Sequence, residues 1–179
     1  MNYKIPVKDI DFSKMKFERK VDIESIQQHG EVPFDELVKI AGAKNIYQDT
    51  AREAETEFNR SNCEQLTEEA FQILAECGTS PALSYLTLLD GVRARTASAI
   101  LAAYNPNKYG IIDERAVNYL KRQGFFPETD SVGSWRDREY IRNFDRYLEI
   151  LGQIVEENPG IETVREADFA LYQLGDLES

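Results

Sequence analysis

Residues 86–120 decide the fold and read LTLLDGVRARTASAILAAYNPNKYGIIDERAVNYL. An apolar helix that begins after Ser80 and Pro81 ends where Asp90-Gly91 interrupts its pattern. A second helix is predicted from Arg93 or Ala94 to Tyr104, and its many small residues allow two helices joined by a short turn to approach closely. The stretch thus predicts two helices around a glycine turn, then a loop, the apolar pair Ile111-Ile112, and a third helix over 114–123.

Helical spacing and helix punctuation continue over most of the remaining chain, and strand signals are scarce. The further predicted helices cover residues 21–28, 34–41, 48–59, 67–77, 135–157 and 161–174. The sequence therefore predicts an all-α, compact multi-helix bundle of about seven to nine helices. The length of 179 residues suits a single domain over 1–179 with two helical lobes, residues 66–123 and residues 1–65 with 124–179.

The composition, 42% hydrophobic and 30% charged, is ordinary for a soluble globular protein. No apolar run is long enough for a transmembrane helix, and the first residues lack the apolar segment of a secretory signal, so we expect a cytoplasmic protein without membrane contact. Two distant cysteines, Cys63 and Cys77, and the single His29 do not make a metal or iron–sulfur site. No metal and no cofactor are therefore expected.

The net charge of −11 argues against indiscriminate binding of nucleic acid, because phosphate contacts need cations. The bases are nevertheless concentrated locally: residues 91–122 hold six bases and two acids, whereas residues 49–76 hold eight acids and two bases. The most basic stretch thus coincides with the glycine turn, a pattern that permits a local phosphate contact.

A turn of this kind binds phosphate through the backbone N–H groups at the start of the following helix. It usually has an apolar residue between two glycines, and here the three positions are Gly91, Val92 and Arg93. An arginine in the second glycine position must either avoid a positive φ or carry strain, and its guanidinium offers a direct phosphate contact instead.

Together, LLDGVRARTASAIL and the following Ile-Ile-Asp resemble the helix–hairpin–helix superfamily of base-excision DNA glycosylases, over about residues 66–123. A weaker likeness lies at READFALYQLG, residues 165–175, where members often have a closing helix. The resemblance implies a DNA-repair protein that binds double-stranded DNA, with Gly91, Val92, Arg93 and Arg95 as the phosphate-binding hairpin. It also implies that Asp113 is the catalytic carboxylate, which stabilises an oxocarbenium-like sugar and activates water.

Bifunctional members of this superfamily carry a nucleophilic lysine at the position of Arg95. Arginine stays protonated and cannot form a Schiff base, so the resemblance implies a monofunctional N-glycosylase, a hydrolase without lyase activity.

Several of these residues have structural alternatives. Asp113 is also a suitable N-cap for the helix that follows it, and the two roles are compatible. Tyr104, Tyr109 and Trp135 are candidates for a base pocket, but aromatic residues at such spacing also occur in cores. The alternative to an enzyme is a non-catalytic helix–hairpin–helix module that binds DNA or a protein partner, favoured by the missing second glycine, the missing lysine and the net charge.

Overall fold

The structure is a computed structural model that describes residues 2–43, 49–126 and 136–177. All regular secondary structure in these ranges is helical, which confirms the all-α prediction. The elements are η1 (Val7–Asp9), η2 (Phe12–Lys14), α1 (Phe17–Lys20), α2 (Ile23–His29), α3 (Phe34–Ala43), α4 (Asp49–Ala54), α5 (Glu57–Cys77), α6 (Thr79–Leu86), α7 (Ala94–Tyr104), α8 (Glu114–Arg122), α9 (Asp137–Glu157) and α10 (Val164–Leu177).

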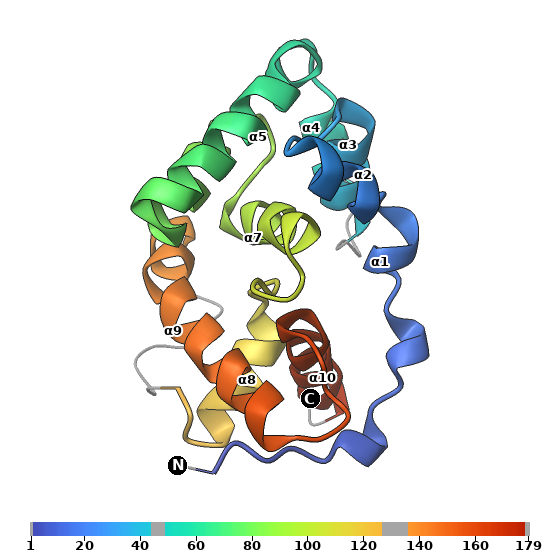
Figure 1. The fold of residues 1–179 in the computed structure, drawn as a ribbon, viewed down its shortest axis with the longest axis vertical. Helices are drawn as coiled ribbons and strands as arrows, with labels where there is room; N and C mark the ends of the chain where they lie inside the picture. Colours follow the sequence, from blue (N-terminus) through green and yellow to red (C-terminus); the bar gives the residue numbers. More distant parts are fainter. Residues whose placement is uncertain (1, 44–48, 127–135, 178–179) are drawn as a thin grey trace.

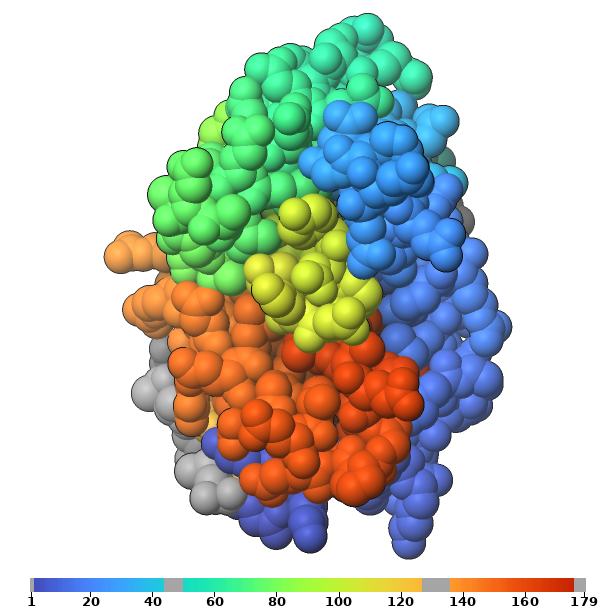
Figure 2. All heavy atoms as spheres, in the orientation of Figure 1, coloured from blue at the N-terminus to red at the C-terminus, as the bar shows by residue number. Residues whose placement is uncertain are grey.

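Helix α7 lies at the centre of the molecule, where it contacts α2, α3, α6 and α9 (Figure 1). Its C-terminal end reaches the surface in the middle of one face, between segments from both ends of the chain (Figure 2). Nearly every side chain from Ala94 to Ala103 is buried, Arg95 being the exception. The small residues therefore allow close packing on all sides of α7, and not only against the preceding helix.

The turn between α6 and α7 is held by the side chain of Asn59 on α5. Asn59 Nδ2 donates to the carbonyl of Asp90 at 2.9 Å, and Asn59 Oδ1 accepts from the Asp90 N–H at 2.9 Å. Gly91 follows with φ +68°, and a Cβ there would lie 2.6 Å from the carbonyl carbon of Glu53. Because the chain begins this turn after Leu86, the predicted extension of the helix to Leu89 was wrong.

Helix α5 corrects the predicted boundaries before residue 77. Thr56 caps the helix by accepting from the Asn59 N–H, and residues 57–77 form one helix, so the predicted helices over 48–59 and 67–77 were wrong in extent. Thr67, the first residue of the predicted helix over 67–77, lies buried in mid-helix, where its hydroxyl donates to the Cys63 carbonyl and accepts from the Val32 N–H. The tertiary contact with Val32 explains why a good capping residue stands inside a helix.

Helices α8, α9 and α10 form the second half of the molecule (Figure 1). Helices α8 and α10 meet so closely that a Cβ on Gly175 would lie 2.4 Å from the Arg115 carbonyl oxygen. Asn158, at the end of α9, holds the N-terminal segment by donating to the Tyr3 carbonyl and accepting from the Ile5 N–H. The first residues of the chain are thereby tied to its last helices.

No helix in the described part of the chain combines the length and the apolar character needed to cross a membrane. Helix α5 continues through residue 66, the predicted boundary between the two lobes, and that division stays a prediction.

Candidate active site

Asp113 precedes α8 and caps it, with Oδ1 accepting from the Arg115 N–H at 2.9 Å. The side chain is half-buried and also lines a pocket, so the capping interpretation and the site interpretation both describe it. A capping carboxylate is held in one orientation by the backbone, which is what a charge-stabilising group in a site requires.

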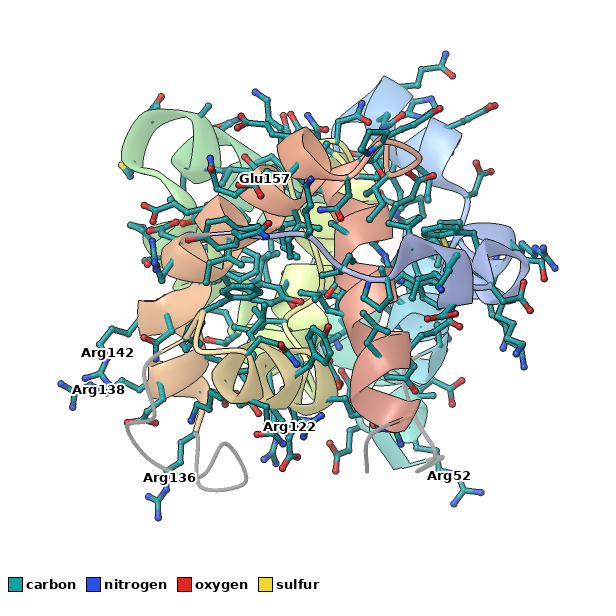
Figure 3. The ribbon with its side chains drawn as sticks, turned by 90° about the horizontal axis from the view of Figure 1, so that it is seen from below. Arg52, Arg122, Arg136, Arg138, Arg142 and Glu157 are labelled. Carbon is teal, nitrogen blue, oxygen red and sulfur yellow. The ribbon has the colours of Figure 1, made fainter. Side chains whose placement is uncertain are left out.

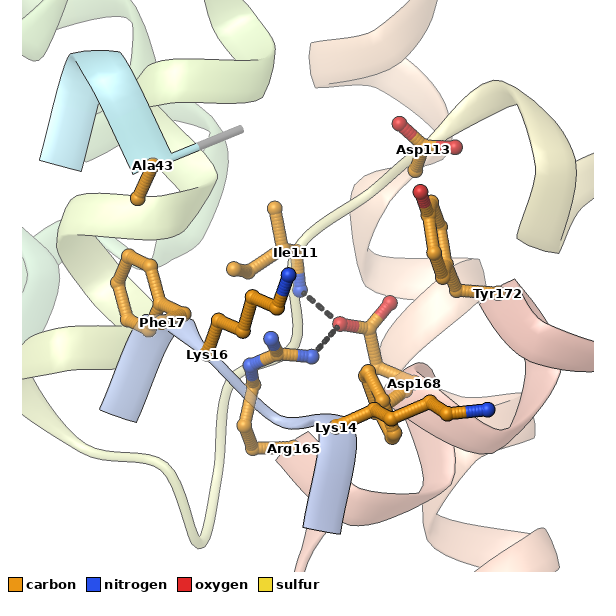
Figure 4. Close-up of a pocket in the computed structure, with 10 residues that line it drawn as sticks. Lys14, Lys16, Phe17, Ala43, Ile111, Asp113, Arg165, Asp168 and Tyr172 are labelled. Carbon is orange, nitrogen blue, oxygen red and sulfur yellow. Dashed lines mark hydrogen bonds and ion pairs between the residues drawn. The ribbon is translucent and has the colours of Figure 1, made fainter. Parts of the chain in front are cut away.

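The pocket beside Asp113 has a volume of about 180 Å³ (Figure 4). A cavity of roughly 150 Å³ binds benzene, so this one has room for a single aromatic ring. Its lining combines aromatic rings, cationic side chains and two carboxylates: Lys14, Lys16, Phe17, Ala43, Ile111, Asp113, Arg165, Asp168, Phe169 and Tyr172. The hydroxyl end of Tyr172 points toward Asp113 (Figure 4), and this hydroxyl accepts from Arg115 Nη1 at 2.7 Å.

The floor of the pocket is organised by Asp168, which is 2% exposed. Its Oδ2 accepts from the Ile111 N–H at 2.9 Å and from Arg165 Nη1 at 2.7 Å, and its Oδ1 accepts from the Tyr147 hydroxyl at 2.5 Å. Burial, followed by the nearby Asp168 charge, raises the pKa of Tyr147 well above its ordinary value, so Tyr147 stays a donor. Asp168 thus holds the backbone segment that leads to Asp113.

Arg165 connects Asp168 to the N-terminal segment. Arg165 is 7% exposed, and its Nε lies 2.8 Å from Glu18 Oε1 on α1. Lys14 and Lys16 stand on the same segment at the rim of the pocket (Figure 4). The rim cations therefore come from residues far from Asp113 in sequence, which is why the sequence did not reveal them.

Of the predicted hairpin residues, Gly91, Val92 and Arg93 lie between α6 and α7 and line a groove that is separate from the Asp113 pocket, whereas Arg95 lies in the first turn of α7. Val92 is buried and Gly91 has a positive φ, as the hairpin pattern requires. Arg93 has φ −106° and ψ 173°, an extended conformation that any residue adopts. The second position of this turn needs no glycine, and the Arg93 side chain is exposed without backbone strain.

Three contacts connect the start of α7 to α8 and α9. The backbone N–H of Ala94, the first residue of α7, donates to Oδ1 of Asp137 at 2.9 Å. The Arg95 guanidinium lies over the Tyr140 ring, 4.9 Å from its centroid, and 3.9 Å from a carboxylate oxygen of Glu114. Arg95 thus reaches the residue next to Asp113.

The aromatic candidates lie elsewhere. Tyr104 stacks on Phe71 with ring centroids 3.9 Å apart, and Tyr109 packs half-buried against the core, where burial raises its pKa. Tyr104 is the last residue of α7 and Tyr109 lies in the loop that follows, at the opposite end of α7 from Gly91, and neither lines the pocket beside Asp113. Trp135 lies outside the described residues.

The two cysteines differ in environment. Cys63 is buried and donates its thiol to the Val32 carbonyl, and burial raises its pKa to about 12, whereas Cys77 is exposed. Across residues 2–43, 49–126 and 136–177, no three His, Cys, Asp or Glu side chains converge in a way that would hold a metal ion. No family model, curated protein or solved structure matches this chain.

Proposed function

We propose that this chain is a DNA glycosylase-like protein of the helix–hairpin–helix type, and that it hydrolyses the N-glycosidic bond of a damaged nucleotide. The observation that carries the proposal is the position of Asp113. Its carboxylate is anchored at the start of α8, beside a pocket with room for one ring, and one short loop after the hairpin helix α7.

Asp113 has two roles in this reaction. As the bond between C1′ and the base nitrogen breaks, its electron pair leaves with the base, and the Asp113 carboxylate stabilises the cationic sugar. The oxygen of a water molecule then bonds to C1′, and Asp113 takes the proton that the water loses. That proton finally passes to the departed base, which leaves an abasic sugar and a neutral base.

The pocket supports a base that has been turned out of the duplex. Phe17, Phe169 and Tyr172 supply apolar and aromatic surface, and Lys14 and Lys16 supply donors at the rim. Donors at the rim favour bases with carbonyl acceptors.

The direct test incubates the protein with duplexes that each carry one lesion, including oxidised, deaminated and alkylated bases. We expect release of a base and an alkali-sensitive abasic site from at least one duplex. Borohydride trapping should give no covalent product, because Arg95 replaces the amine of the lyase. Absence of release from every duplex under single-turnover conditions would contradict the catalytic proposal.

A second candidate is a DNA-binding module without chemistry. It is favoured by one observation, namely that the hairpin groove and the Asp113 pocket share no lining residue. Duplex binding without excision of any lesion is the result that this candidate predicts.

A further inference from the structure

Five arginines gather where the start of α9 lies against the turn before α7. The hydrogen bond from the Ala94 N–H to Asp137 joins the two segments, so the arginines on either side of these two residues come from neighbouring stretches of backbone: Arg93, Arg95, Arg136 and Arg138, with Arg142 one helical turn after Arg138. Arg136, Arg138 and Arg142 extend outward from one corner of the molecule, and Arg122 lies along the same side (Figure 3). Arg136, Arg138 and Arg142 lie outside the basic stretch of residues 91–122.

Four of the five arginines are exposed and make no ion pair with any residue that the structure describes: Arg93, Arg136, Arg138 and Arg142. The two acids in the first turn of α9 are engaged by backbone. Asp137 accepts from the Ala94 N–H at 2.9 Å, and Glu139 accepts from the Arg136 N–H at 3.0 Å. In a chain of net charge −11, this edge has unpaired cations available for an anionic partner.

Asp137 also changes how a phosphate can be held here. In a hairpin of this type, the N–H groups at the start of the second helix face a DNA phosphate. In this chain, the N–H of the first residue of α7 already has a carboxylate partner. A phosphate near the turn must then be held largely by side chains, and Arg93 stands at that position.

We propose that Arg93, Arg136, Arg138 and Arg142, named here the arginine edge, bind the phosphate backbone of duplex DNA beside the hairpin. Arg138 and Arg142 are one helical turn, or roughly 6 Å, apart along α9. Consecutive phosphates of one DNA strand rise by roughly 3.4 Å each along the axis, so these two side chains match about two phosphates. The inference shares the DNA partner of the proposed function and does not require its chemistry.

The test measures binding of a lesion-free duplex over a range of salt concentrations. For the triple variant Arg136→Gln, Arg138→Gln and Arg142→Gln, we expect the slope of log K against log salt to become shallower by about three, since each phosphate contact contributes about one. The single variant Arg138→Gln removes one exposed cation, and its slope should become shallower by about one. It replaces the triple variant in this test if the triple variant does not fold.

A charge-matched control is the triple variant Lys4→Gln, Lys8→Gln and Lys20→Gln, which removes three exposed cations from the N-terminal segment and α1, away from α9. Its slope should stay that of the wild type. An equal decrease of the slope in both triple variants would overturn the proposal. Failure of the wild type to bind duplex at low salt would overturn it as well.

The outcome is separable from the catalytic proposal, because binding and base release are measured independently. If the arginine triple variant loses about three in slope and the wild type excises no base from any duplex, the arginine edge stands and the enzyme proposal fails. If the wild type excises a base and the arginine variant keeps the full slope, the arginine edge fails and the enzyme proposal stands.

Discussion

Asp168 holds Ile111: the buried carboxylate accepts from the Ile111 backbone N–H at 2.9 Å and thereby sets the course of the chain two residues before Asp113. The two residues are 57 positions apart in sequence, on α10 and on the loop before α8. Gly110 permits this approach, because a Cβ there would lie 2.9 Å from the Asp168 Cβ. The geometry of the candidate active site thus depends on a tertiary contact.

Asp168→Asn should lower the free energy of unfolding by about 3 kcal/mol, because it leaves the buried Arg165 without one carboxylate partner. Urea unfolding of the variant checks this prediction. Asp11→Asn, at an exposed carboxylate, is the control and should change the stability little. Equal stability of Asp168→Asn and the wild type would show that the buried pair contributes nothing net.

Gly91→Ala should destabilise the protein more than Gly124→Ala. Both glycines have a φ near +70°, so both substitutions carry the strain of a left-handed residue, about 1 kcal/mol. Only the Cβ at residue 91 would meet another segment, at 2.6 Å from the Glu53 carbonyl carbon, whereas residue 124 faces open space. Thermal unfolding of the two variants measures the difference, and equal losses would contradict the close approach of α4 to the turn.

Thiol labelling should find one reactive cysteine in the native protein and two after denaturation. Cys77 is exposed, whereas burial raises the pKa of Cys63 to about 12 and keeps it protonated. The unfolded thiol ionises near its ordinary pKa of 9.0. The Cys63 contribution to stability is therefore complete below pH 9 and is lost as the pH rises toward 12. Rapid labelling of both thiols in the native protein would be inconsistent with this burial.

Asp137→Asn should bind duplex DNA about fivefold more tightly at low salt. The amide oxygen can still accept from the Ala94 N–H, and the lost negative charge next to the arginine edge is worth about 1 kcal/mol. Fluorescence anisotropy with a labelled duplex gives the affinity, and Glu149→Gln, at an exposed site farther along α9, is the matched control. Unchanged or weaker binding of Asp137→Asn alone would place the phosphates away from α9.

Much of the fold is local and was predictable. The capping residues and glycines of the central stretch predicted α7 and α8 to within about one residue, since helix ends depend on nearby chemistry. The start of α5 was missed because Thr67 has the chemistry of a cap, and only its tertiary contact with Val32 explains its place inside the helix.

The candidate site was predictable only in part. Asp113 stood out because it follows the predicted hairpin and precedes a helix, and both are sequence features. The pocket also needs Lys14 and Lys16 from the N-terminal segment and Asp168 from α10, and no local pattern joins them to Asp113. The spacing of Arg165 and Asp168, three residues apart on one helix, was the only sequence signal of the buried pair.

Asp113→Asn tests most directly whether the Asp113 carboxylate performs the chemistry, because asparagine is also a good N-cap. The measurement is the single-turnover rate of base release from the lesion that the wild type excises best, with unfolding free energy and duplex affinity measured in parallel. We predict a rate at least about 100-fold lower with stability and affinity retained. A rate equal to that of the wild type would contradict the assignment of Asp113.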